Sequence, residues 1–193
     1  MLPHYEHTTY LNVSELRTIA DVGLIGFPNA GKSTLLRAIS RARPKVAAYP
    51  FTTLKPHIGM VPYEDGLQVA VADIPGIIPE AHKNKGLGIS FLRHIERCSC
   101  LLYVIDVSQP DPHEQLESLY YELEQFCPGL SKRPRGIIAN KMDLPSSHEN
   151  IGAFRDWLRK EPNHHLITLS GKLGHNVTEL LQFIRRMYDT RTT

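Results

Sequence analysis

Residues 26–33 read GFPNAGKS and match the pattern G-x-x-x-x-G-K-[ST] in full. The apolar run of residues 21–26 predicts a buried strand before this loop, and residues 32–40 carry apolar side chains at helical spacing after it. A glycine-rich loop in this setting surrounds a phosphate with backbone N–H groups and the positive end of a helix. Its structural alternative is a turn that Ser33 caps. In the phosphate-binding interpretation, Lys32 reaches the β- and γ-phosphates, and the Ser33 hydroxyl ligates Mg²⁺.

A second motif, NKMD at residues 140–143, follows the predicted strand 136–139 and indicates which base is bound. The Asp143 carboxylate accepts hydrogen bonds from N1–H and the 2-amino group of guanine, whereas adenine presents no such pair of donors. An aspartate facing adenine would be desolvated and unpaired, at a cost of ~1–3 kcal/mol. Alone, NKMD also occurs as a simple turn. Downstream of the phosphate loop, we interpret it as a guanine site.

A third motif, DIPG at residues 73–76, ends the predicted strand 67–72. Asp73 is placed to hold Mg²⁺ through water, and the N–H of Gly76 to meet the γ-phosphate. The alternative is a turn that merely ends the strand. Thr53 is the candidate second hydroxyl ligand of Mg²⁺, and the sequence alone does not separate it from the adjacent Thr52.

The rest of the pattern alternates strands with helices. Further strands are predicted at residues 58–61, 67–72, 101–105, 136–139 and 165–169, and further helices at 91–97, 113–126, 151–159 and 177–188. A turn at residues 64–66 joins the two strands that flank it into a hairpin. We expect one α/β domain of the P-loop NTPase fold, with a mostly parallel six-stranded sheet and helices on both faces.

Composition narrows the function classes. The chain has 193 residues, 41% of them hydrophobic, and 22 Lys and Arg against 20 Asp and Glu. This charge balance does not by itself indicate a nucleic-acid binder. No apolar run approaches the ~20 residues of a membrane span. The first nine residues lack the features of a targeting peptide.

The cysteines and histidines suggest neither a disulfide framework nor a structural metal. Cys98, Cys100 and Cys127 form no C-x-x-C pair, and we expect reduced thiols in or near the core. The ten histidines do not have the spacing of metal ligands.

Five stretches carry a resemblance to a known family. They are GFPNAGKSTLL (26–36), YPFTTLKPHIG (49–59), ADIPGII (72–78), GLGISFLRHIERC (86–98) and NKMDLP (140–145). Over residues 16–188 the chain resembles the GTPase domain of the Obg family. The stretches FTTLKP and GLGISFLRHIER are far more specific to that family than the phosphate loop.

The resemblance implies a nucleotide site built from five loops. Lys32, Thr53 and Gly76 would take the catalytic roles, and Ser33, Thr53 and Asp73 would ligate Mg²⁺. The family more often has Ser-Ala where this chain has Ser170-Gly171. The implied nucleotide-binding positions are Gly26, Phe27, Pro28, Asn29, Ala30, Gly31, Lys32, Ser33, Thr34, Phe51, Thr52, Thr53, Asp73, Ile74, Pro75, Gly76, Asn140, Lys141, Met142, Asp143, Ser170, Gly171 and Lys172.

The resemblance also implies domain organisation. Obg proteins carry a glycine-rich N-terminal domain, and residues 10–17 resemble its last strand leading into a linker. We therefore expect residues 1–20 to be the end of such a domain plus linker, and residues 21–193 to be the GTPase domain. On this interpretation the chain is a fragment or a degenerate form of an Obg protein.

The implied function is a switch that hydrolyses GTP to GDP and assists assembly of the large ribosomal subunit. The stretches ELRTIAD and HIERC most resemble the mitochondrial branch of the family in animals, which implies that the protein acts in the mitochondrial matrix. The bacterial branch, and with it the cytoplasm, stays open. Two other functions stay open as well: a nucleotide-binding module with little hydrolysis, and an Obg-like ATPase, against which the intact NKMD counts.

Hydrolysis of GTP is expected to be slow without an activating partner or ion. Ile77 stands where Ras-type sites have the glutamine that orients water. Asn29 either helps to hold K⁺ beside the phosphates or only stabilises its loop.

Two segments, 49–59 and 73–88, are expected to change order with the bound nucleotide. In or just after the second of them, Lys83, Lys85, Arg93 and Arg97 form either an RNA contact or a solvated basic face.

Overall fold

The structure is a computed structural model and describes residues 19–46, 55–74, 95–130, 133, 135–160 and 164–192. One sheet has the order β2-β3-β4-β1-β5-β6-β7. The β2–β3 and β3–β4 pairs are antiparallel, and the other pairs are parallel. The strands are β1 (Ala20–Ile25), β2 (Lys45–Val46), β3 (His57–Pro62), β4 (Gln68–Asp73), β5 (Cys98–Asp106), β6 (Arg135–Asn140) and β7 (Leu166–Thr168).

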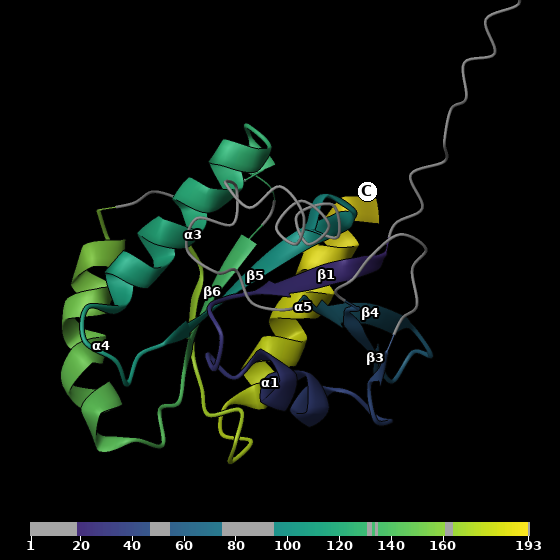
Figure 1. Cartoon of the computed structure of the whole chain (residues 1–193). Coiled ribbons are helices and arrows are strands. Elements are labelled where there is room, and N and C mark those ends of the chain that lie inside the picture. The colour runs from purple at the N-terminus through teal and green to yellow at the C-terminus, as the bar shows by residue number, and fades with distance from the viewer. Residues whose placement is uncertain are drawn as a thin grey trace, which may run out of the picture.

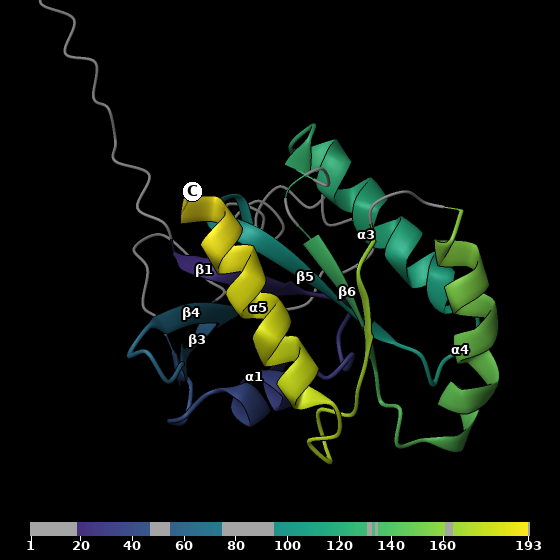
Figure 2. The same ribbon diagram turned by 180° about the vertical axis from the view of Figure 1, so that it is seen from behind.

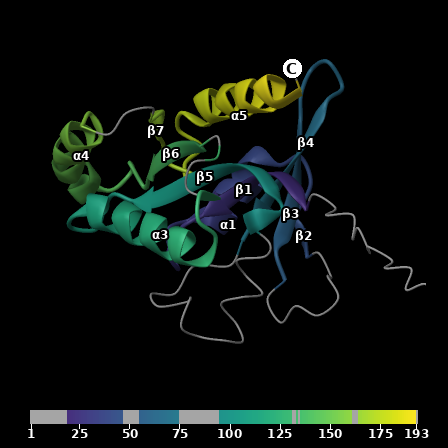
Figure 3. The ribbon, with the colours of Figure 1, turned by 90° about the horizontal axis from the view of Figure 1, so that it is seen from above.

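Helices cover both faces of the sheet. They are α1 (Lys32–Ile39), α3 (Pro112–Phe126), α4 (Pro145–Leu158) and α5 (Val177–Thr192). The long helix α5 lies behind the strands in Figure 1 and in front of them in Figure 2. Seen from above, α5 and α3 lie on opposite sides of the strands (Figure 3). No helix within the described ranges is long and apolar enough to cross a membrane.

The sheet separates two apolar clusters. In one, Leu116 and Leu119 of α3 and Phe154 of α4 pack on alternate residues of β5. In the other, Leu36 of α1 and Ile184 of α5 pack on the opposite face. Burial on both faces explains why β5 is almost continuously apolar, as is usual for a central parallel strand.

The cysteines lie where the sequence predicts. Cys98 and Cys100 are buried in β5 and Cys127 is half-buried, and none of the three forms a disulfide. Burial raises the pKa of the Cys98 thiol to about 12, so this group stays protonated at neutral pH.

The predicted α/β fold with a mostly parallel sheet is confirmed, and two details differ. A seventh strand, β2, lies inside the predicted loop 43–56 as a two-residue edge strand. Helix α4 begins at Pro145, six residues before the predicted start of 151. Proline suits the first turn of a helix because its fixed φ is helical and its missing N–H has no partner to lose there.

The topology determines where a ligand can meet several loops at once. Strands β1, β4, β5, β6 and β7 run parallel, so their carboxyl ends meet at one edge of the sheet. In open α/β sheets that edge is where ligands bind. The motifs GFPNAGKS, DIPG and NKMD each begin at or directly after one of these carboxyl ends.

Candidate nucleotide-binding site

The loop after β1 is shaped by two glycines. A Cβ at Gly26 would lie 2.4 Å from the carbonyl oxygen of Val104, so only glycine lets the loop pass β5 this closely. Gly31 has a φ of +97°, and a Cβ there would lie 2.3 Å from Nδ2 of Asn140. Asn29 also has a positive φ, 64°. These residues fold the chain back on itself just before α1 begins.

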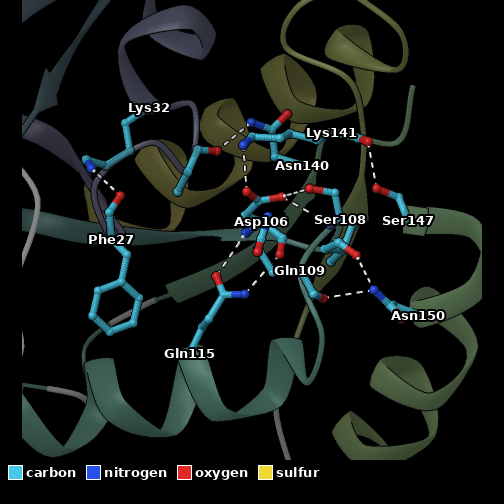
Figure 4. Close-up of polar contacts among 12 residues, drawn as sticks. Phe27, Lys32, Asp106, Ser108, Gln109, Gln115, Asn140, Lys141, Ser147 and Asn150 are labelled. Carbon is cyan, nitrogen blue, oxygen red and sulfur yellow. Dashed lines mark hydrogen bonds and ion pairs between the residues drawn. The ribbon is translucent and has the colours of Figure 1, made fainter. Parts of the chain in front are cut away.

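The side chain of Lys32 extends back across this loop to the loop's first two residues. Its Nζ donates to the carbonyl oxygens of Gly26, at 2.9 Å, and Phe27, at 3.1 Å (Figure 4). The residue is only 6% exposed. Burial lowers the pKa of Lys32, while the Asp73 carboxylate acts in the opposite direction. The loop therefore holds a nearly buried cation at the start of α1, and a cation beside a helix N-terminus suits a phosphate.

Ser33 and Asp73 come together although they are 40 residues apart. The Ser33 hydroxyl donates to Oδ2 of Asp73, the last residue of β4. Oδ1 of Asp73 is buried and has no hydrogen-bond partner among the described residues. A buried carboxylate oxygen without a donor is costly, and Mg²⁺ prefers oxygen ligands of this kind. The pair thus fits a magnesium ion.

Asn140 joins the phosphate loop to the loop after β7. Its Nδ2 donates to the carbonyl oxygen of Ala30, at 2.8 Å, and its Oδ1 accepts from the N–H of Gly171, at 3.0 Å. The residue is 3% exposed, so both bonds are shielded from water. A Cβ at Gly171 would make ordinary contacts at 3.4 Å or more. The departure from Ser-Ala at this position is therefore not forced by crowding.

Asp143 is held by the same loop. Its Oδ1 accepts a hydrogen bond of 2.6 Å from the Ser170 hydroxyl, which in turn accepts from the N–H of Leu173 at 3.1 Å. The hydrogen bond from Ser170 is the main reason why the pKa of Asp143 is lowered. The carboxylate is therefore ionised at neutral pH and available as an acceptor.

One cavity of about 550 Å³ connects the phosphate loop with the NKMD motif. This volume lies within the range of small-molecule and cofactor sites. Lys172, which lines it, belongs to the loop after β7. The other lining residues are Asn29, Gly31, Lys32, Ser33, Thr34, Arg37, Asn140, Lys141, Asp143 and Leu144.

Two predicted site residues pack in or against the apolar core, and five others lie outside the described residues. The five are Phe51, Thr52, Thr53, Pro75 and Gly76. Ile74 is fully buried and packs in the apolar core. Met142 packs against that core as well, while its N–H donates to the carbonyl oxygen of Leu169, at 3.1 Å.

The sequence did not indicate three residues of this site: Arg37 and Leu144, which line the cavity, and Asp106. Asp106, the last residue of β5, forms an ion pair of 2.6 Å with Lys141 (Figure 4). The available signal was its position: a lone carboxylate ends an apolar strand, as Asp73 does. The partner follows from the sheet, because Asp106 lies opposite Asn140 in the β5–β6 register.

Comparison with known proteins agrees with this geometry. Mitochondrial ribosome-associated GTPase 2 of Homo sapiens is 58% identical over 175 residues, which cover 91% of this chain and 42% of the relative. GTPase Obg of Moorella thermoacetica is 48% identical over 180 residues, covering 92% of this chain and 42% of the relative. The chain thus spans less than half the length of these relatives.

Solved structures and a family model complete the comparison. Era of Aquifex aeolicus, solved with GDP and AlF4⁻, matches the fold with a TM-score of 0.64 at 22% identity, over 86% of this chain and 56% of that one. The family described as 50S ribosome-binding GTPase matches residues 21–141, more than half of the chain. By that match, the chain belongs to the family of 50S ribosome-binding GTPases.

Proposed function

We propose that this chain binds GTP and hydrolyses it to GDP and phosphate, as the switch of a protein that assists assembly of the large ribosomal subunit. The observation that carries the proposal is the single cavity that Lys32 and Ser33 share with Asp143. A phosphate site alone would accept any nucleotide. An ionised aspartate at the other end of the same cavity selects the base that offers two donors.

Each part of the site has a role in this proposal. Residues 26–34 wrap the phosphates, and Lys32 neutralises the β- and γ-phosphates. Ser33 and Asp73, together with Thr53, would hold Mg²⁺, which would offset the negative charge of the phosphates. Gly76 would sense the γ-phosphate. Asn140 keeps the phosphate loop and residues 170–172 in register, so that phosphate and base are bound at a fixed separation.

Two assays test the proposal. Competition against a fluorescent GDP should show GTP and GDP displacing it at far lower concentration than ATP. Release of phosphate from GTP should be slow for the chain alone and faster with large ribosomal subunits. Equal displacement by ATP would favour the ATPase alternative. Tight binding of GTP without hydrolysis, with or without ribosomal subunits, would favour the alternative of a nucleotide-binding module.

We also propose a role for K⁺ in hydrolysis. Asn29 belongs to the phosphate loop, is exposed and lines the cavity, where its oxygen would help to hold a monovalent cation. Turnover is expected to be several-fold faster in K⁺ than in Na⁺ at equal ionic strength, and Asn29→Ala should remove the difference. Phosphate release in the two salts measures this. Equal rates for the original chain would leave a ribosomal or protein partner as the missing activator.

Positive charge beside the edge strand β2 supports the proposed ribosomal partner. Between Asp21 and Glu64 the chain has six Lys or Arg residues and no Asp or Glu. Three of them, Arg41, Arg43 and Lys45, are exposed along a groove of about 320 Å³ beside β3. An excess of cations over anions on one surface is suited to the phosphates of RNA. Of the cations predicted earlier, Arg97 is exposed, and the other three fall outside the described residues.

Replacing the three groove cations by alanine should weaken binding to RNA in a salt-dependent way. The slope of log affinity against log salt should fall by roughly 2–3, about one for each lost phosphate contact. Fluorescence anisotropy with a labelled single-stranded RNA measures this slope. The matched control replaces Arg155, Arg159 and Lys160, three exposed cations of α4 and its end. If the groove cations only protect the open edge of β2, the slope stays unchanged and aggregation increases.

We further propose that the protein works in the mitochondrial matrix, with residues 1–20 as the end of an N-terminal domain and linker and residues 21–193 as the GTPase domain. The human relative, mitochondrial ribosome-associated GTPase 2, supports the mitochondrial location. Fractionation of cells that express the native protein tests it: recovery outside mitochondria would contradict the proposal.

A further inference from the structure

The ion pair between Asp106 and Lys141 lies beside the base end of the nucleotide cavity. Oδ2 of Asp106 is 2.6 Å from Nζ of Lys141. Asp106 is 7% exposed, whereas Lys141 is half-buried and lines the cavity. One end of the lysine side chain is thus fixed away from the ligand, while the rest of the residue borders the space that a base would fill.

The carboxylate of Asp106 is held on its other sides as well (Figure 4). Its Oδ1 accepts hydrogen bonds from the N–H of Ser108, at 3.1 Å, and from the Ser108 hydroxyl, at 2.5 Å. The side chain of Gln115 in α3 forms two hydrogen bonds with the backbone of Asp106. Its Oε1 accepts from the N–H of Asp106 at 3.2 Å, and its Nε2 donates to the carbonyl oxygen of Asp106 at 2.9 Å. Because its main chain and both of its carboxylate oxygens form hydrogen bonds or an ion pair, Asp106 is held in one position.

The main chain of Lys141 is fixed independently. Its φ is 68°, and its carbonyl oxygen accepts from the Ser147 hydroxyl, at 2.7 Å, and from the N–H of Leu144, at 3.0 Å. A lysine held at both ends can no longer sample its many rotamers. Freezing such a side chain during binding lowers affinity, so a lysine that is ordered beforehand binds its ligand more tightly.

We infer that Asp106 is a positioning residue for base recognition. By holding the ammonium group of Lys141, it fixes the four-carbon chain as an apolar wall against the plane of the guanine. Asp143 then accepts hydrogen bonds from a base whose orientation is already fixed. This inference rests on the proposed function, because it requires that a guanine nucleotide occupies the cavity.

A double-mutant cycle tests the inference on the full 193-residue chain. The affinity for GDP is measured for the original chain, Asp106→Asn, Lys141→Ala and the double variant. Asp106→Asn is expected to lower affinity about tenfold in the original chain and less than twofold when Lys141 is already alanine. Ser108→Ala, which keeps the ion pair and the backbone N–H donor to Oδ1 but removes the hydroxyl donor, should cause a smaller loss. It also serves as the test variant if Asp106→Asn does not fold.

The matched control removes a carboxylate from an ion pair of the same length elsewhere. Arg185 and Asp65 are also 2.6 Å apart, where α5 meets the β3–β4 turn. Asp65→Asn should leave the affinity for GDP unchanged. An equal loss in both Lys141 backgrounds, or no loss from either Asp106→Asn or Ser108→Ala, would overturn the inference. Failure of the original chain to bind any guanine nucleotide would instead contradict the proposed function.

Discussion

Asp143→Asn is expected to lower the affinity for GTP about thirtyfold or more, equivalent to ~2 kcal/mol. The carboxylate is ionised, because the hydrogen bond from Ser170 lowers its pKa. It can therefore accept two charge-assisted hydrogen bonds from guanine, which are stronger than neutral ones. An amide can accept one and must turn its NH₂ group toward the 2-amino group, where two donors face each other. Isothermal titration with GTP and GDP measures the loss.

Xanthosine nucleotides provide the matched control for this prediction. Xanthine has a carbonyl oxygen where guanine has the 2-amino group, so the amide of the variant donates to it. Asp143→Asn should therefore gain affinity for xanthosine triphosphate while it loses affinity for GTP. Thermal unfolding without nucleotide should change little, since Asp143 is only half-buried. Loss of affinity for both nucleotides by the same factor would show that Asp143 supports the loop and does not distinguish the base.

The phosphate loop was predictable because its signal is contiguous in the sequence. The motif lies between a buried strand and an amphipathic helix, and Gly31 has a φ of +97°. The close approaches of Gly26 to Val104 and of Gly31 to Asn140 join distant segments, and they were not needed to recognise the motif. A short run of residues thus sufficed for the prediction. The same is true of the hairpin, whose turn contains Gly66 with a φ of +83°.

What the sequence could not provide depends on contacts between distant segments. The ion pair of Asp106 joins residues 35 apart, and the register of β5 against β6 brings them together. Asn140 was predicted to hold guanine, and its bonds to Ala30 and Gly171 became evident only once β1, β6 and β7 were placed. Strand β2 was missed because two residues, Lys45 and Val46, are too few for a hydrophobic period.

Lys32→Ala is expected to lower the affinity for GTP at least roughly a hundredfold, because two charge-assisted hydrogen bonds to phosphate oxygens are each worth ~1.5–3 kcal/mol. Without ligand, the ammonium group donates to the carbonyl oxygens of Gly26 and Phe27. Burial disfavours its charge and lowers its pKa. A bound phosphate would supply the missing negative charge, so the cation and the ligand stabilise each other. Titration with GTP at fixed Mg²⁺ concentration measures the effect.

The preference for GTP over ATP separates this role from that of Asp143. Lys32 lies at the phosphate end of the cavity and does not contact the base motif, so Lys32→Ala should weaken GTP and ATP by the same factor. Lys160→Ala, which removes an exposed lysine just after α4, is the matched control and should leave both affinities unchanged. A Lys32→Ala variant that bound GTP as tightly as the original chain would remove Lys32 from the phosphate site. A variant that lost preference for GTP would show that the two ends of the cavity do not act independently, and that the phosphate loop helps to orient the base.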